Sequence, residues 1–254
     1  MCLLALVTNG SGAVIAVKQT GTNNVSAVLP QVEAATLTEE SFAFVDRTHE
    51  LTSARFVPST GVLTTDATGT LVGFPSYLLG LTYVANANNN RSAGLETDTR
   101  GSYKVTYTVD RPSVAYLLLD NRLDGTAGNV SKVNTTDPNL GGNLAWVVQD
   151  GWTRVTTGIM PNGQGDYIGI DEGGSVAGPA DRTHHDPGAG IGLNNFYAIY
   201  KKNVTGSFDT FSIRQPTGTG NMYVVAVAPI PEPSTVGLLA LGFLSLLGVS
   251  RRRH

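Results

Sequence analysis

Hydrophobic and polar residues alternate in the middle of the chain. From Tyr103 to Val109 the odd-numbered positions are Tyr or Val and the even-numbered ones are Lys or Thr. This period of two is typical of a β-strand with one buried face. After Arg111-Pro112, which ends or bends that strand, residues 114–119 (VAYLLL) form a continuous apolar run of strand length. The two segments predict successive strands.

Other runs of strand length recur, separated by clusters of Gly, Asn, Asp and Pro. They cover residues 42–45, 81–85, 145–148, 167–170, 196–200, 208–213 and 222–228. About ten short strands without long helical periodicity favour an all-β fold, an antiparallel β-sandwich or jelly roll, over alternating βαβ units. We expect one domain over residues 20–228.

The N-terminal residues 1–16 indicate the second half of a secretory signal peptide. An apolar run from Leu3 to Val7 is followed by small residues, with Val14 and Ala16 placed as before a cleavage site. No positive residue precedes the apolar run, so we expect the natural start of translation upstream. An ordinary N-terminal strand is the alternative.

The C-terminal residues 229–254 have a different composition. Three prolines in 229–233 form a stiff spacer, residues 236–249 carry no charge, and arginines follow. Counted as helical, residues 234–250 would span roughly 25 Å, against a hydrocarbon core of ~30 Å that a thinned bilayer or snorkelling arginines would match. The sequence predicts a single transmembrane helix over 236–249, with the arginines cytoplasmic and the body outside.

This order of features resembles the PEP-CTERM sorting signal of Gram-negative bacteria that make extracellular polysaccharide. The resemblance implies a transient anchor in the inner membrane and processing by an exosortase, a membrane transpeptidase-like enzyme. By this resemblance, the exosortase would recognise Pro231, Glu232 and Pro233, and the arginines would stop transfer of the chain through the membrane. These arginines are Arg251, Arg252 and Arg253. A plain single-span anchor, or a tail helix packed on the body, is the alternative.

The middle of the chain also resembles a β-sandwich module of secreted bacterial proteins. Its motifs have the forms L-x-G-x-x-Y-[IV]-x-x-A-N-[DN] and V-Y-[VL]-x-x-D-x-R, and their counterparts are residues 78–89 and 114–122. The chain departs from them by an extra residue in 114–116 and by Asn89 where an acid is common. Such modules accompany carbohydrate-active and surface domains, and no catalysis is generally assigned to them.

Charge and cysteine content exclude some partners and chemistry. The chain has 254 residues, with 17 Lys and Arg against 20 Asp and Glu and a formal charge of −3, which disfavours a nucleic-acid partner. The single cysteine, Cys2, cannot form an intrachain disulfide.

Two kinds of metal site are candidates. Asp181 to Asp186 contains two histidines between acids, as zinc would accept, although adjacent histidines on an extended loop point apart; a solvated loop is the alternative. Carboxylates in two turns could hold a structural calcium ion, although neither turn has the EF-hand spacing. These carboxylates are Asp120, Asp124, Asp166, Asp171 and Glu172.

Aromatic side chains are candidates for glycan binding, because their faces stack on pyranose rings. Trp146, Trp152 and Tyr83, together with Tyr77, could form such a platform, whereas tryptophans in a sandwich commonly lie in the core. A glycosidase would need two facing carboxylates, and the sequence cannot select a pair. We assign no catalytic residue.

Three functions are consistent with these features. We favour an exported β-sandwich with a structural or interaction role, sorted to the cell envelope or the exopolysaccharide matrix. The first alternative is a carbohydrate-binding module that contacts exopolysaccharide. The second is a polysaccharide hydrolase or lyase.

Overall fold

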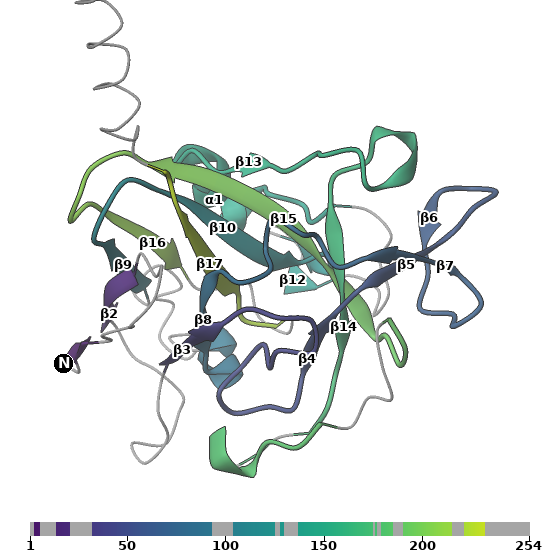
Figure 1. Ribbon diagram of the computed structural model, residues 1–254, viewed down its shortest axis with the longest axis horizontal. Helices are drawn as coiled ribbons and strands as arrows, with labels where there is room; N and C mark the ends of the chain where they lie inside the picture. The colour runs from purple at the N-terminus through teal and green to yellow at the C-terminus, as the bar shows by residue number, and fades with distance from the viewer. Residues whose placement is uncertain are drawn as a thin grey trace, which may run out of the picture.

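The protein is mostly β, with its strands in antiparallel sheets (Figure 1). The computed structural model describes residues 3–5, 14–20, 32–92, 104–124, 128–129, 137–174, 176, 179–184, 190–214 and 221–231. The antiparallel all-β prediction is confirmed at this level.

One sheet has four strands in the order β1-β2-β9-β16. These are β1 (Leu3–Ala5), β2 (Val14–Thr20), β9 (Lys104–Val109) and β16 (Thr210–Arg214). In β9 the alternation seen in the sequence becomes a buried face of Val105, Tyr107 and Val109, while Thr106 and Thr108 stay partly exposed. The sheet therefore has one face in the core.

The larger sheet has eight strands and runs β3-β8-β17-β10-β15-β14-β4, with β13 also paired to β15. Its strands are β3 (Val32–Thr36), β4 (Glu50–Thr52), β8 (Thr82–Asn86), β10 (Ser113–Asp120), β13 (Thr153–Arg154), β14 (Tyr167–Asp171), β15 (Asn195–Val204) and β17 (Val224–Pro229). β10 lies between β17 and β15, and Leu117, Leu118 and Leu119 are all fully buried. Both faces of this part of β10 are covered, which explains its continuous apolar run.

The large sheet curls strongly, like half of a barrel. β4 is its last strand and β8 lies next to the opposite edge, yet one segment bridges to both: Phe42 pairs with Glu50 of β4, and Phe44 pairs with Asn86 of β8. Such bridges are possible only if the two ends of the sheet approach each other. The residues predicted as a strand at 42–45 are thus isolated bridges in a connecting segment.

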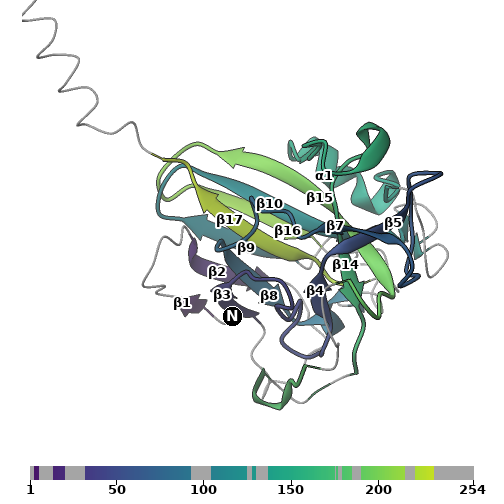
Figure 2. The ribbon, with the colours of Figure 1, turned by 45° about the vertical axis from the view of Figure 1, so that its right-hand side comes forward.

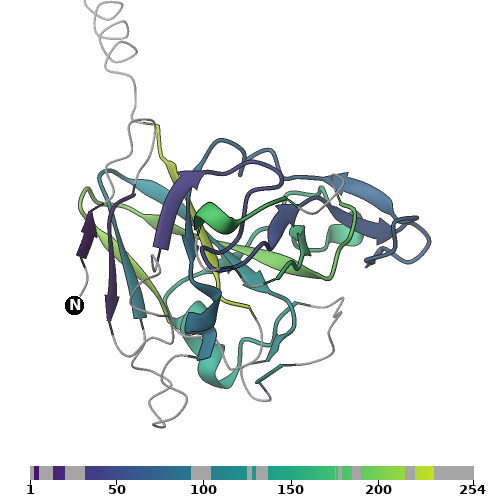
Figure 3. The same ribbon diagram turned by 90° about the horizontal axis from the view of Figure 1, so that it is seen from below.

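The remaining elements are short. A three-stranded sheet contains β5 (Ala54–Val57), β6 (Val62–Leu63) and β7 (Thr70–Gly73), and a two-stranded one contains β11 (Leu123–Asp124) and β12 (Gly128–Asn129). The helices are η1 (Asn88–Ser92), η3 (Gly142–Leu144), α1 (Ala145–Gln149), η4 (Pro161–Gly163) and η5 (Pro179–Asp181). β5, β6 and β7 lie on the opposite side of the molecule from β9 and β16 (Figures 1 and 3).

The strand prediction for residues 145–148 is wrong, because this segment forms the single helical turn of α1. Its two valines suggested a strand, but they follow the turn at Gly141 and Gly142. In the helix Trp146 and Val147 are buried and Val148 is exposed.

Tyr107, on the four-stranded sheet, joins this sheet to the large one. Tyr107 of β9 stacks on Phe211 of β16, with ring centroids 5.0 Å apart, and Trp152 meets Phe211 edge-on. The Tyr107 hydroxyl donates a 3.2 Å hydrogen bond to Asn86 Oδ1 at the end of β8. The four-stranded sheet therefore lies against the large sheet through a shared apolar core (Figure 2).

The predicted terminal segments are only partly described. Leu3–Ala5 pairs with Ala16 to Lys18, as in the alternative of an N-terminal strand. The signal peptide over 1–16 stays a prediction, since pairing in the full chain does not test cleavage. The predicted transmembrane helix at 236–249 lies outside the described residues; within them, no helix has the length and hydropathy needed to cross a membrane.

Candidate functional site

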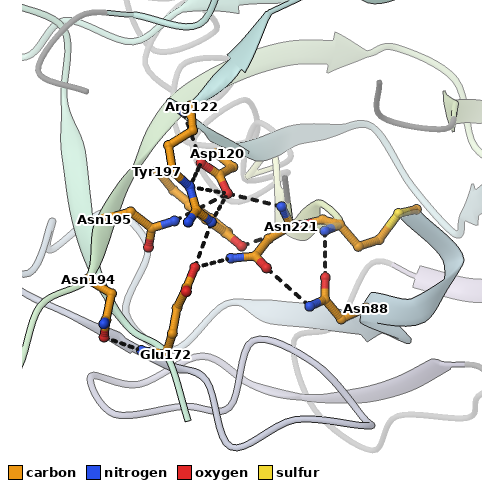
Figure 4. Close-up of polar contacts among 9 residues, drawn as sticks. Asn88, Asp120, Arg122, Glu172, Asn194, Asn195, Tyr197 and Asn221 are labelled. Atoms are coloured by element: carbon orange, nitrogen blue, oxygen red, sulfur yellow. Dashed lines mark hydrogen bonds and ion pairs between the residues drawn. The ribbon is translucent and has the colours of Figure 1, made fainter. Parts of the chain in front are cut away.

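The ends of five strands meet at one end of the large sheet. Because β10 is antiparallel to both β15 and β17, its last residue, Asp120, lies near the start of both strands. β8 and β14 end beside them. The polar residues at these ends form what we call the loop-end network: Asn88, Asp120, Arg122, Glu172, Asn194, Asn195 and Asn221 (Figure 4).

Arg122 is the centre of the loop-end network. Its Nη2 lies 2.5 Å from Asp120 Oδ2 and 2.6 Å from Glu172 Oε1, and its Nε donates to both oxygens of Asp120. Arg122 is 6% exposed and Asp120 is fully buried. One guanidinium thus joins the turn after β10 to the residue after β14.

Asparagine side chains extend this ion pair to the other strand ends. Asn195 Nδ2 and the backbone N–H of Asn221 donate to Asp120 Oδ2, over 3.2 and 3.0 Å. Asn221 Nδ2 donates to Glu172 Oε1, and Asn88 Nδ2 donates to Asn221 Oδ1. Asn194 Oδ1 accepts from the backbone N–H of Glu172. Each loop is therefore held by a side chain from another loop.

A second buried carboxylate holds the turn after β8. Asp46 is fully buried and accepts the backbone N–H groups of Asn88, at 2.6 Å, and Asn89, at 3.1 Å. Arg47 pairs with Asp46 and donates to Asn89 Oδ1. Because Asn88 also contacts Asn221, this turn is continuous with the loop-end network.

The pKa shifts in the loop-end network are consistent with a fixed, charged ion pair. Burial acts to lower the pKa of Arg122, but the hydrogen bonds and charge of Asp120, with the charge of Glu172, outweigh it and raise this pKa above its ordinary value. The pKa of Tyr197 is raised, first by burial and then by the nearby Asp120 charge. Arg122 therefore stays protonated and supplies, between Asp120 and Glu172, the positive charge that a calcium ion would supply.

The predicted calcium ligands do not all come together. Asp120 and Glu172 share Arg122, whereas Asp124 accepts from Asn139 Nδ2. Among the residues that the structure describes, no group of three or more His, Cys, Asp or Glu side chains is arranged to hold a metal ion. Calcium binding stays a prediction.

Asp166 lies in a separate polar cluster, and Asp171 is buried at the end of β14. Asp166 accepts the Tyr77 hydroxyl at 3.0 Å and the Thr157 hydroxyl at 2.7 Å. Burial, and then the Asp166 charge, raise the pKa of Tyr77 above its ordinary value. This carboxylate therefore joins the segments that carry Tyr77 and Thr157.

The aromatic residues proposed for glycan binding are in the core. Trp146 and Trp152 are 4% and 3% exposed, and Trp146 packs against Tyr223. Tyr83 is also buried, and its hydroxyl donates to the Phe42 carbonyl. These rings offer no exposed face to a sugar.

The histidine-containing loop lies at the edge of the large sheet. His184 Nδ1 is 2.6 Å from Oε1 of the buried Glu50, and its ring stacks on Phe42. Arg182 lies over the Phe42 ring, 4.9 Å from its centroid. His185 and Asp186, the other predicted ligands of this loop, lie outside the described residues.

Sequence reasoning missed several polar residues of this end. The candidate residues from the sequence do not include Asp46, Arg47, Asn195 and Asn221, although Asn195 and Asn221 directly precede the strands predicted at 196–200 and 222–228. The two motifs at 78–89 and 114–122 do meet in space, because Asn88 and Asp120 both contact Asn221.

The last strand leads directly into a recognised sequence signal. Residues 229–253 match the PEP-CTERM protein-sorting motif, which confirms the expectation from the sequence. This motif indicates export, sorting to the cell surface and processing by an exosortase. No curated protein and no solved structure matches the chain.

Proposed function

We propose that this chain is a structural or interaction protein of the cell envelope or exopolysaccharide matrix, with a β-sandwich body delivered by its C-terminal motif. The observation that carries the proposal is the motif at 229–253, whose first residue, Pro229, is the last residue of β17. The body and the sorting signal are therefore joined without a long linker.

The proposed sandwich, over residues 20–228, consists of β9 and β16 of the four-stranded sheet packed on the curled sheet. Such a body must keep its fold outside the cell without an intrachain disulfide, since Cys2 is the only cysteine. The loop-end network supports this role, because Arg122 and its partners crosslink the loops non-covalently.

The tail has three parts in this proposal. Pro231, Glu232 and Pro233 are the recognition motif, residues 236–249 are the transient membrane segment, and Arg251 to Arg253 hold the far end in the cytoplasm. Residues 1–16 direct export and are removed, so β1 and the first three residues of β2 belong only to the chain before cleavage.

Two tail variants separate sorting from simple anchoring. Deletion of 234–254 should release the body to the periplasm or medium, because no other apolar run in the sequence reaches membrane-spanning length. Replacement of residues 231–233 by alanine keeps the apolar segment and should leave the full-length chain in the membrane, unprocessed. Membrane retention of the deletion variant, or normal processing of the alanine variant, would contradict the proposal.

A second candidate function is carbohydrate binding at a site other than the buried tryptophans. Tyr77 and Tyr116 are partly buried, and their rings lie 5.4 Å apart at an angle of 32°. The Tyr77 hydroxyl is fixed by Asp166, so the ring position is defined before any ligand arrives. Loss of glycan-array binding in Tyr116→Ala, but not in a matched Phe208→Ala variant, would support this function. Absence of binding by the unaltered chain would reject it.

A further inference from the structure

We propose that the end of the body from which the C-terminal motif leaves is a membrane-contacting surface, with Phe208 as its apolar anchor. It rests on the proposed function, because the motif must first bring the chain to a bilayer. The partner is the headgroup region of the lipid bilayer.

Strand pairing brings three segments to this end. Ser113, the first residue of β10, pairs with Val204 at the end of β15 and with Pro229 at the end of β17. The turn at 110–112, the turn at 205–209 and the exit at 230–231 therefore lie side by side. We call them the exit face.

Backbone hydrogen bonds hold these segments together. The Ile230 N–H donates to the Pro112 carbonyl at 2.8 Å. The Phe208 N–H donates to the Val109 carbonyl at 2.8 Å, and the Val109 N–H donates to the Asp209 carbonyl at 3.1 Å. Asp209 also accepts the Gly206 N–H through its side chain. The exit face is thus a defined surface.

The backbone conformation of Phe208 is unfavourable for a phenylalanine. Its φ is +63°, a region that suits Gly or Asn and disfavours bulky L-residues. Its side chain is 70% exposed, the most exposed of the large hydrophobic residues that the structure describes. A strained and exposed phenylalanine at a turn indicates contact with something outside the body.

The length of the tail indicates what that contact is. Five residue steps separate Pro231 from Val236, where the predicted apolar segment begins, and they reach at most about 18 Å. A headgroup region is roughly 6 Å thick on each side of the hydrocarbon core. Before processing, the exit face is therefore held close to the lipid surface, with Phe208 and the partly exposed Ile230 on it.

The charges of the exit face favour an apolar contact over an electrostatic one. Arg111 pairs with Asp110, with Nη2 2.8 Å from Oδ2, and Asp209 is bound to its own turn. No excess of positive charge is present among the described residues of this face. Contact should therefore occur on uncharged phosphatidylcholine and should not depend on salt.

The test uses the full chain in phosphatidylcholine vesicles that carry nitroxide-labelled headgroups. With Cys2→Ser as background, an environment-sensitive fluorophore is attached at Ser207→Cys, beside an intact Phe208. Quenching should be strong at this site. It should be lost when Phe208→Asn is added, because asparagine accepts the same backbone conformation without the ring. The matched control is a label at Leu71→Cys on β7, which is 42% exposed but lies away from the exit face, and it should not be quenched.

The possible outcomes separate the proposed membrane anchor from the proposed membrane contact of the exit face. If the chain does not float with the vesicles, the membrane-anchor proposal and this inference both fall. If it floats but the label at position 207 is not quenched, the proposed function stands and the exit-face inference is overturned; a face that contacts only the exosortase would give this result. Equal quenching with and without the Phe208→Asn substitution, in variants with the same urea midpoint, would show tethering alone and would also overturn it.

Discussion

Replacement of Arg122 by methionine is the most informative change in the body. Methionine keeps much of the apolar volume of the side chain and removes the guanidinium. It leaves Asp120, which is fully buried, and Glu172 facing each other without the charge between them. Asn195 and the Asn221 backbone still donate to Asp120, so the carboxylate keeps part of its hydrogen bonding.

Removal of one partner of a buried ion pair costs about 3–5 kcal/mol, because the other charge stays buried. For a domain of this size each kcal/mol lowers the melting temperature by roughly 2–4 °C, so Arg122→Met should melt roughly 6–20 °C below the unaltered chain. Arg122→Lys keeps a positive charge but loses the forked guanidinium that reaches Asp120 and Glu172 together. Its melting temperature should therefore lie between those of Arg122→Met and the unaltered chain.

The assay is urea or thermal unfolding of the full chain in mild detergent, followed by tryptophan emission. Trp146 and Trp152 are both buried, so their emission reports loss of the core. The matched control is Arg214→Met, which removes an exposed contact of 3.8 Å to Asp150 and should cost less than about 1 kcal/mol. If Arg122→Met costs no more than Arg214→Met, the loop-end network does not hold the fold as described.

Three further predictions concern pH, calcium and orientation. Burial raises the pKa of six tyrosines, so the folded state keeps protons that the unfolded chain releases above about pH 10, and the free energy of unfolding should fall as the pH rises above about 10. The absorbance of these tyrosines at 295 nm should then change only when the chain unfolds. Titration of these tyrosines at about pH 10 in the folded chain would contradict the prediction. These tyrosines are Tyr77, Tyr116, Tyr167, Tyr197, Tyr200 and Tyr223. If calcium occupies the acidic turns, a calcium concentration of 100 times Kd adds about 2.7 kcal/mol to the free energy of unfolding and raises the melting temperature by roughly 5–10 °C. Identical melting curves in EDTA and in millimolar calcium would reject the site. Replacement of Arg251 to Arg253 by glutamate should disturb orientation or processing by removing the cytoplasmic positive charge, and unchanged surface display would refute this.

The strands that the sequence predicts best are those whose apolar pattern directly shows how many faces are covered. β9 has one covered face and shows alternation, and β10 has two covered faces and shows a continuous apolar run. By contrast, the sequence predicts a strand where α1 forms, because a five-residue segment with two valines is too short for a helical and a strand period to be distinguished.

The loop-end network was beyond local reasoning for a physical reason. The acids at Asp120 and Glu172 were visible and suggested calcium, but their partner Arg122 pairs with Asp120 only because the chain turns after β10. Asn221 is 101 residues from Asp120 and reaches it through the pairing of β10 with β17. Pairing over such a distance has no signal in one sequence.

The central claim is that the motif at 229–253 sorts this body to the cell surface through an exosortase. The most direct measurement is the location and intact mass of the chain in two otherwise identical Gram-negative strains, with and without that enzyme. The account predicts a shortened chain at the surface or in the medium when the enzyme is present, and a chain with its tail intact in the inner membrane when it is absent. The same location and the same mass in both strains would contradict it.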